Sequence, residues 1–286
     1  MTALARVSSQ SIGGTAVLVL GGLLAVAYVP VLIDVTVVAW SVSYYSHALL
    51  VPLFSAWLLW QDRRSRNGGP PAILPGVLLL GIAAAVLVTG TVAASLTLRA
   101  LSIVPGAFGI ALLTAGRAGT RASAFPIGFL VLMVPLPSGA IPQLSLPLQQ
   151  LAANVAAFAL NTSGIPSIQQ GLLVHMPNGI SLHVTEACNG LRFLFAMLVV
   201  GVAFAGLAVR GTIRRGLTVL LALAIAIAAN LVRVSGTGVI AYAWGPEAAS
   251  GFMHVAYGKI VYAVMLVPFA AVVLLLRRSS VSVTSR

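Results

Sequence analysis

Long apolar runs separated by short polar connections make up most of the chain. About 20 apolar residues span a bilayer as a helix, so runs of this length predict transmembrane helices. The predicted spans are at about 15–33, 46–60, 74–94, 98–116, 122–138, 188–209, 216–243 and 253–276. We interpret the first run as a retained helix rather than a signal peptide, because it is long and further spans follow it. The pattern predicts an all-α polytopic membrane protein with about eight spans.

One connection, residues 138–187, is much longer than the others. In residues 144–160 the apolar positions recur mostly at helical spacing, while Gln149, Gln150 and Asn154 occupy other positions. This spacing predicts a small amphipathic helix that lies in or dips into the membrane interface.

The second half of this connection alternates between apolar and more polar positions, as a β-hairpin does. The turn is expected at residues 177–179, Pro-Asn-Gly. The apolar positions of the two strands are Leu172, Val174 and Met176, then Ile180, Leu182 and Val184. The second strand then leads to Cys188, where the sixth span is expected to open.

Composition agrees with a membrane protein, since 59% of residues are hydrophobic and 7% are charged. The net charge of +12 does not indicate nucleic-acid binding, because the basic residues form short clusters between apolar runs. Cytoplasmic loops are enriched in Lys and Arg, so these clusters place both termini in the cytoplasm. The clusters are Arg6; Arg63, Arg64 and Arg66; Arg117 and Arg121; Arg210, Arg214 and Arg215; and Arg277, Arg278 and Arg286. The remaining basic residues, expected toward the outer side, are Arg99, Arg192, Arg233 and Lys259.

Residues 1–286 are predicted to form a single integral-membrane domain, because the chain shows no repeat, low-complexity tract or separate soluble part. One cysteine cannot form an intramolecular disulfide. No phosphate-binding loop or paired-carboxylate site is present, and no cofactor is expected. His175 and His183, on facing strands of the hairpin, lack a third ligand, so no metal site is predicted.

Ionisable side chains within or at the ends of spans are candidates for function because burying them in a membrane is costly. Cys188 is expected at the N-terminus of the sixth span, where the helix dipole favours a thiolate. The alternative is a small buried hydrophobe. Glu186 precedes it as a dipole partner for the first helical turn, and Arg192 follows one turn in, as a supporting side chain or a lipid contact.

Three further residues are expected on the same side of the membrane as Cys188. Arg233 lies three residues after Asn230, so both polar groups share one helical face, which usually points into the bundle. The alternative is that Arg233 extends to the lipid headgroups. His254 and His47 open the eighth and second spans. His254 next to a thiol would form a Cys/His pair, whereas alone it would be an ordinary interfacial histidine.

The segment Glu186-Ala187-Cys188-Asn189-Gly190-Leu191-Arg192 resembles the exosortase/archaeosortase family of membrane enzymes. The order of the other similar segments makes the resemblance specific. These are Tyr45-Ser46-His47-Ala48, Phe125-Pro126-Ile127-Gly128-Phe129, Pro135-Leu136-Pro137, Gly164-Ile165-Pro166, Asn230-Leu231-Val232-Arg233 and residues 254–258. Asn189 stands where the family often has Ser, and Ala48 where it often has Gly, so the subfamily and its recognised motif stay open.

The resemblance implies a cysteine protease or transpeptidase with Cys188 as nucleophile and Arg233 and His254 as its partners. His254 points to the bacterial branch, because the archaeal branch has Arg there. His47, Glu186, Asn189, Arg192 and Asn230 are the supporting or substrate-binding candidates. The implied substrates are exported proteins with a C-terminal sorting signal of the PEP-CTERM kind: a short motif, a transmembrane helix and a basic tail.

By this resemblance, cleavage occurs outside the cytoplasm through a thioester, and the product passes to a membrane lipid or another envelope acceptor. Two other classes stay open. One is a non-catalytic transporter or assembly component of an exopolysaccharide pathway, which disagrees with the scarcity of polar residues in the inner half of the spans. The other is a membrane acyltransferase, for which no path for an acyl donor is recognisable.

Overall fold

The computed structural model describes residues 22, 26–61, 69–249 and 251–281, without the side chains of residues 178, 187, 251–255 and 276–281. Most of these residues are helical. They form two compact units, which meet in the sequence between Pro137 and Ser138. The single domain that we predict over residues 1–286 stays a prediction.

The first unit consists of helices only, within its described residues. Its elements are a helix at Val26–Ser41, η1 (Ser43–Leu49), α2 (Leu50–Gln61), α3 (Ile73–Val92), α4 (Leu96–Leu101), α5 (Ile103–Ala122), α6 (Ala124–Phe129) and η3 (Leu130–Met133). Glycines let α3 and α5 approach closely: a Cβ at Gly76 would lie 2.7 Å from Leu113 Cδ2, and one at Gly109 2.8 Å from Leu80 Cδ2. Small residues commonly make such contacts between membrane helices.

Polar contacts tie the ends of these helices together. Arg99 Nη1 lies 2.8 Å from Asp34 Oδ2, which joins α4 to the helix Val26–Ser41. The Tyr28 hydroxyl donates to the Ser102 carbonyl at 2.9 Å, so a second bond joins the same two regions. In an apolar environment such bonds are costly to break, because the freed groups find no water.

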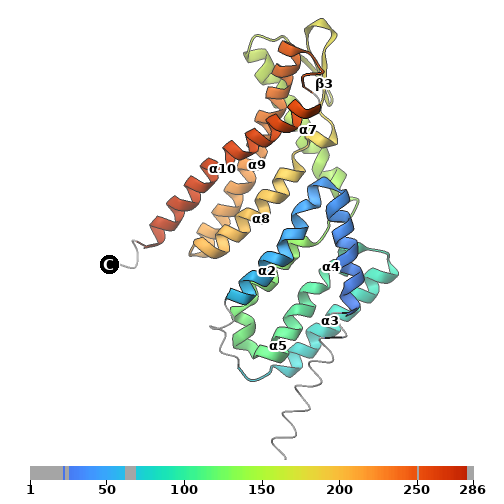
Figure 1. Cartoon of the computed structure of the whole chain (residues 1–286), viewed down its shortest axis with the longest axis vertical. Helices are drawn as coiled ribbons and strands as arrows, with labels where there is room; N and C mark the ends of the chain where they lie inside the picture. The colour runs from blue at the N-terminus through green and yellow to red at the C-terminus, as the bar shows by residue number, and fades with distance from the viewer. Residues whose placement is uncertain (1–21, 23–25, 62–68, 250, 282–286) are drawn as a thin grey trace, which may run out of the picture. The chain divides into compact units, whose positions relative to one another are not determined.

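The second unit carries the sheet and the longest helices. Its elements are α7 (Ala140–Thr162), β1 (Ile168–Gln170), β2 (Leu173–His175), η4 (Pro177–Gly179), β3 (Ser181–His183), η5 (Glu186–Cys188), α8 (Leu191–Ala208), α9 (Thr212–Trp244) and α10 (Gly251–Val281). Helix α9 packs against α7, α8 and α10, and Figure 1 shows α8, α9 and α10 running alongside one another. Ala152, Ala156 and Leu160 of α7 form a core with Val174 and Val184 at the sheet.

The hairpin predicted around residues 177–179 is confirmed. Strands β2 and β3 pair antiparallel, with Val174 opposite Leu182. A further strand, β1, was not predicted; it adds to the other edge of β2 in the order β1-β2-β3. Its sequence, Ile-Gln-Gln, has only one apolar residue and therefore gives no alternation to detect.

Five of the eight predicted spans are confirmed by length and composition within the described residues. They are Ile73–Val92, Leu96–Ala122, Leu191–Ala208, Thr212–Trp244 and Ala256–Leu275. The predicted helix at residues 144–160 is also present, as the longer α7. Its small side chains pack against the second unit's core, and its position relative to the membrane interface stays a prediction.

The other three predicted spans are not confirmed. The run at 15–33 falls mostly outside the described residues, and the helix found there continues to Ser41. The run at 46–60 is divided between η1 and the 12-residue α2, where Pro52 lacks the N–H that a continuous helix would need. The run at 122–138 is helical only to Met133, since the residues before Pro135 and Pro137 disfavour helix.

Candidate active site

Cys188 is the last residue of the turn η5, which joins β3 to α8. Its backbone N–H donates to the Thr185 carbonyl at 2.9 Å, and the Thr185 hydroxyl lies 4.0 Å from Cys188 Sγ. The side chain is half-buried against the core of the second unit. The thiol is therefore held in a fixed turn and is still partly accessible.

The expectation that Cys188 opens the sixth span is wrong. Helix α8 begins at Leu191, because Gly190 has φ 78° and ψ 0°, a left-handed conformation that interrupts a right-handed helix. Asn189 Oδ1 accepts a hydrogen bond from the Leu191 N–H at 2.9 Å and so satisfies one of the free donors of the first turn. Glu186, expected to precede that helix as a dipole partner for its first turn, begins η5 and is exposed.

Asn230 of α9 holds the backbone of the cysteine turn. Its Nδ2 donates to the Cys188 carbonyl at 2.9 Å, and its side chain is 4% exposed. The same amide packs on Gly190, where an added Cβ would lie 2.7 Å from Asn230 Cγ. Asn230 therefore points into the bundle, as expected for a residue that shares a helical face with Arg233.

Arg233 lies one turn further along α9, between α8 and α10. Its guanidinium carbon is 5.6 Å from the centre of the Phe193 ring, which is within cation–π range, and that ring stacks on Tyr262. A Cβ at Gly258 of α10 would lie 2.8 Å from Arg233 Nε, so the glycine makes room for the guanidinium. Arg233 interacts electrostatically with Cys188, Arg192 and Tyr257. The structure thus brings Cys188, Asn230 and Arg233 together.

Position 254 lies in the first turn of α10, but its side chain is outside the described residues. A helix places residue 254 on the same face as residue 258. Arg192, the second residue of α8, is exposed. Its charge is close enough to Arg233 for the two cations to interact.

His47 belongs to the first unit, in η1. Its Nδ1 lies 3.0 Å from the Tyr44 carbonyl oxygen, and burial lowers the pKa of its imidazole below the usual 6.5. The support of the cysteine site by His47 stays a prediction.

A buried polar cluster beside Cys188 was not predicted as part of the site. Asn189 Nδ2 donates to the Ser145 hydroxyl at 2.7 Å, and Gln149 Nε2 donates to the same hydroxyl at 2.6 Å. All three side chains are at most 6% exposed. Gln149 was predicted on the polar face of an interfacial helix, and Ser145 was not singled out. The one available signal was their spacing of four residues, which places both on one helical face.

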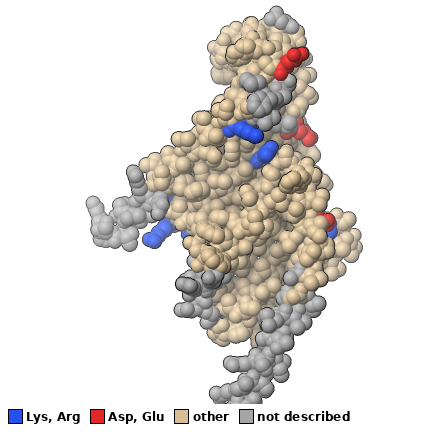
Figure 2. Space-filling view, in the orientation of Figure 1, with Lys and Arg blue, Asp and Glu red and all other residues tan. Residues whose placement is uncertain are grey.

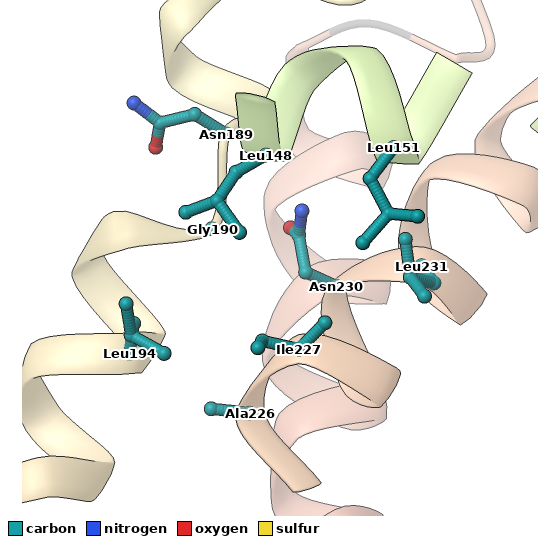
Figure 3. Close-up of a pocket in the computed structure, with 9 residues that line it drawn as sticks. All are labelled: Leu148, Leu151, Asn189, Gly190, Leu194, Ala226, Ile227, Asn230 and Leu231. Carbon is teal, nitrogen blue, oxygen red and sulfur yellow. The ribbon is translucent and has the colours of Figure 1, made fainter. Parts of the chain in front are cut away.

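A small cavity separates the cysteine turn from α7 and α9 (Figure 3). Its volume of about 10 Å³ is enough for roughly one water molecule. In Figure 3, Asn230 rises from α9 toward Gly190, with Leu148 and Leu151 of α7 nearby. Asn230 Oδ1 is buried and has no hydrogen-bond partner among the described residues, so it offers an acceptor to such a water.

Charged side chains are sparse on the face shown in Figure 2, as the composition requires. His175 and His183 do not face each other directly: His175 pairs with Ser181, whose hydroxyl lies 2.9 Å from His175 Nδ1. Within the described residues, no group of three His, Cys, Asp or Glu side chains could hold a metal ion.

The chain matches a known protein family. The model described as transmembrane exosortase (Exosortase_EpsH) matches residues 40–271, which include most of the first unit, the cysteine turn, α8 and α9. Neither the curated proteins nor the solved structures give a match.

Proposed function

The chain belongs to the transmembrane exosortase family, and from this premise we propose that it is a membrane cysteine transpeptidase with Cys188 as its nucleophile. The observation that carries the proposal is the grouping of Cys188, Asn230 and Arg233. One face of α9 supplies both an amide that binds the Cys188 carbonyl and a cation that interacts with Cys188.

The proposed reaction begins with attack of the Cys188 thiolate on a scissile peptide carbonyl. A C–S bond forms, and the carbonyl π electrons move to oxygen as an oxyanion. The oxyanion then collapses, the C–N bond breaks, and His254 gives a proton to the leaving amine. The product of this half is a thioester between Cys188 and the N-terminal part of the substrate. Water or an amine-bearing acceptor then attacks the thioester and gives a proton back to His254, and the C–S bond breaks to release the thiolate.

Arg233 has two possible electrostatic roles in this scheme: it stabilises the thiolate before attack, or the oxyanion after it. The stacking of Phe193 on Tyr262, with Arg233 over the Phe193 ring, limits the movement of the guanidinium. A fixed cation in a site with little water stabilises developing charge without reorganisation, and removing one such donor costs about 100- to 1,000-fold in rate. The dipole of α8 stabilises a Cys188 thiolate less than expected, because the thiol precedes the helix.

We further propose that the substrates are exported proteins with a C-terminal sorting signal of the PEP-CTERM kind: a motif, an apolar helix and a basic tail. The site faces the outside of a bacterial inner membrane, and both termini are cytoplasmic. The support for this orientation is the distribution of Arg residues between the spans. A membrane lipid or another envelope molecule accepts the cleaved protein.

Co-expression with a tagged exported protein that ends in such a signal tests this proposal. Candidates are chains encoded nearby that end in a motif, one apolar helix and an Arg cluster. The wild-type chain is expected to shorten the tagged protein, Cys188→Ala to leave it intact, and Arg233→Met to slow its processing about 100-fold or more. Lys259→Met is the matched control, since it removes an exposed cation from α10. Processing by Cys188→Ala at the wild-type rate would show that the nucleophile is another group.

A further inference from the structure

The turn that carries Cys188 is held from two directions in the second unit. From α9, Asn230 binds the Cys188 carbonyl. From α7, the Ser145 hydroxyl binds the side chain of Asn189, the next residue in the chain. The Asn189 side chain in turn accepts from the Leu191 N–H, so it fixes both the turn and the start of α8.

The hydroxyl of Ser145 makes hydrogen bonds that are unusual for a serine inside a helix. Such a serine commonly bonds only to the carbonyl of its own preceding turn. Here the hydroxyl oxygen accepts from both Asn189 and Gln149, which uses its two lone pairs. The serine is 2% exposed, so no bulk water replaces either partner. Gln149, one turn along α7, thus orients the hydroxyl toward the cysteine turn.

The Asn189 amide has few other hydrogen-bond partners within reach. Buried amides strongly prefer to be hydrogen-bonded, and the space next to Asn189 is lined mainly by apolar side chains, among them Leu148, Leu151 and Leu194. The polar side chain that also lines it, Asn230, already donates its Nδ2 to the Cys188 carbonyl. If Ser145 is removed, the nearest way to satisfy the Asn189 amide is a movement of the turn toward water. Such a movement shifts Cys188, which is covalently joined to Asn189, relative to Arg233.

We propose that Ser145, oriented by Gln149 and acting through Asn189, is a positioning residue that sets the distance between the Cys188 thiol and the Arg233 guanidinium. The catalytic consequence of this inference rests on the proposed function, but the geometric part does not. Helix α7 therefore holds the Cys188 thiol close to the Arg233 guanidinium. Helix α7, which lies on the chain's longest connection, thus supplies a positioning residue to the proposed catalytic site.

The thiol itself provides the test, because Cys188 is the only cysteine of the chain. The purified full-length protein is alkylated with iodoacetate, which is anionic, and with iodoacetamide, which is neutral. The ratio of the two rates depends on the cation next to the thiol and cancels changes in general accessibility. Arg233→Met gives the ratio without the cation.

Ser145→Ala is expected to lower this ratio several-fold, toward the Arg233→Met value, whereas Ser145→Thr, which keeps the hydroxyl, restores the wild-type ratio. Thr218→Val is the matched control: Thr218 is 0% exposed, and its hydroxyl bonds the Arg214 carbonyl in the same helix. This control is expected to keep the ratio even if it lowers stability. In an Asn189→Ala background, Ser145→Ala is expected to have no further effect, because Ser145 acts through Asn189.

Processing of a sorting-signal protein is expected to show a fall in kcat of about 10- to 100-fold for Ser145→Ala, with KM unchanged, since misplaced reacting groups slow chemistry more than binding. If Ser145→Ala does not fold, Gln149→Leu against Gln150→Leu makes the same comparison, because Gln149 is buried and Gln150 exposed. A wild-type ratio in the folded Ser145→Ala variant, or in Gln149→Leu, overturns the proposal. If the wild-type chain processes no substrate, the proposed function fails, and the alkylation ratio still decides the role of Ser145.

Discussion

Gly190→Ala is the substitution that separates backbone strain from disturbance of the site. Gly190 has φ 78°, so any residue with a Cβ is strained there. The added Cβ would also lie 2.7 Å from Asn230 Cγ and 2.8 Å from its Nδ2, and the amide must therefore move. Since this Nδ2 binds the Cys188 carbonyl, the substitution reaches the cysteine turn through Asn230.

The expected cost has two parts. A left-handed conformation costs an alanine about 1–2 kcal/mol relative to glycine. Loss of the Asn230 hydrogen bond adds about 0.5–1.5 kcal/mol. Gly164→Ala is the matched control, because Gly164 has φ 81° and no atom within 4 Å of an added Cβ. Gly164→Ala should therefore show only the cost of the left-handed conformation.

The assay measures the free energy of unfolding of each variant in detergent, together with the rate at which Cys188 is alkylated by iodoacetamide. Gly190→Ala is expected to be less stable than Gly164→Ala by about 0.5–1.5 kcal/mol and to change the alkylation rate, whereas Gly164→Ala leaves that rate at the wild-type value. Equal losses of stability, with equal alkylation rates, would refute the claim that Asn230 holds the cysteine turn.

Two predictions concern the first unit. Asp34→Leu or Arg99→Leu alone should cost about 0.2–1 kcal/mol of unfolding free energy, because the side chains of Arg99 and Asp34 are 24% and 44% exposed, and the double substitution should cost less than the sum of the two; additive losses would contradict this. Burial lowers the pKa of His47, so its neutral form stabilises the fold above pH 6.5, and this contribution is lost as the pH falls below it. Thermal unfolding followed against pH should therefore lose part of its acid sensitivity in His47→Gln; an unchanged profile would contradict the assignment.

Much of the helical arrangement could be predicted from the sequence, because apolar runs of membrane length carry a strong signal. The breaks were harder to predict. Pro52 and Pro135 lie inside apolar runs. A hydrophobicity pattern does not show that proline lacks an N–H or that the backbone of the residue before it is restricted. The strand β1 was missed for the opposite reason, since its pairing depends on β2 rather than on its own polar sequence.

The catalytic roles of Cys188, Arg233 and His254 stay predictions, and the local structure around Cys188 differs from the predicted one. The spacing of Asn230 and Arg233 correctly indicated a shared inward face. The start of α8 was misplaced because the run from Cys188 onward looks helical, and only the backbone of Gly190 shows that the helix begins later. The link from Ser145 to Asn189 joins residues 44 positions apart, and the sequence pattern gave no sign of that distant contact.

The most direct test of the central claim is a search for a thioester on Cys188 during processing. A tagged sorting-signal protein is incubated with the full-length chain, the reaction is stopped in acid, and the Cys188 peptide is analysed by mass spectrometry. We predict an adduct on Cys188 whose added mass is that of the C-terminal peptide of the cleaved N-terminal part of the substrate, less one water; hydroxylamine removes this adduct, and it is absent in Cys188→Ala. Cleavage of the substrate without any adduct on Cys188, and unimpaired in Cys188→Ala, would contradict it.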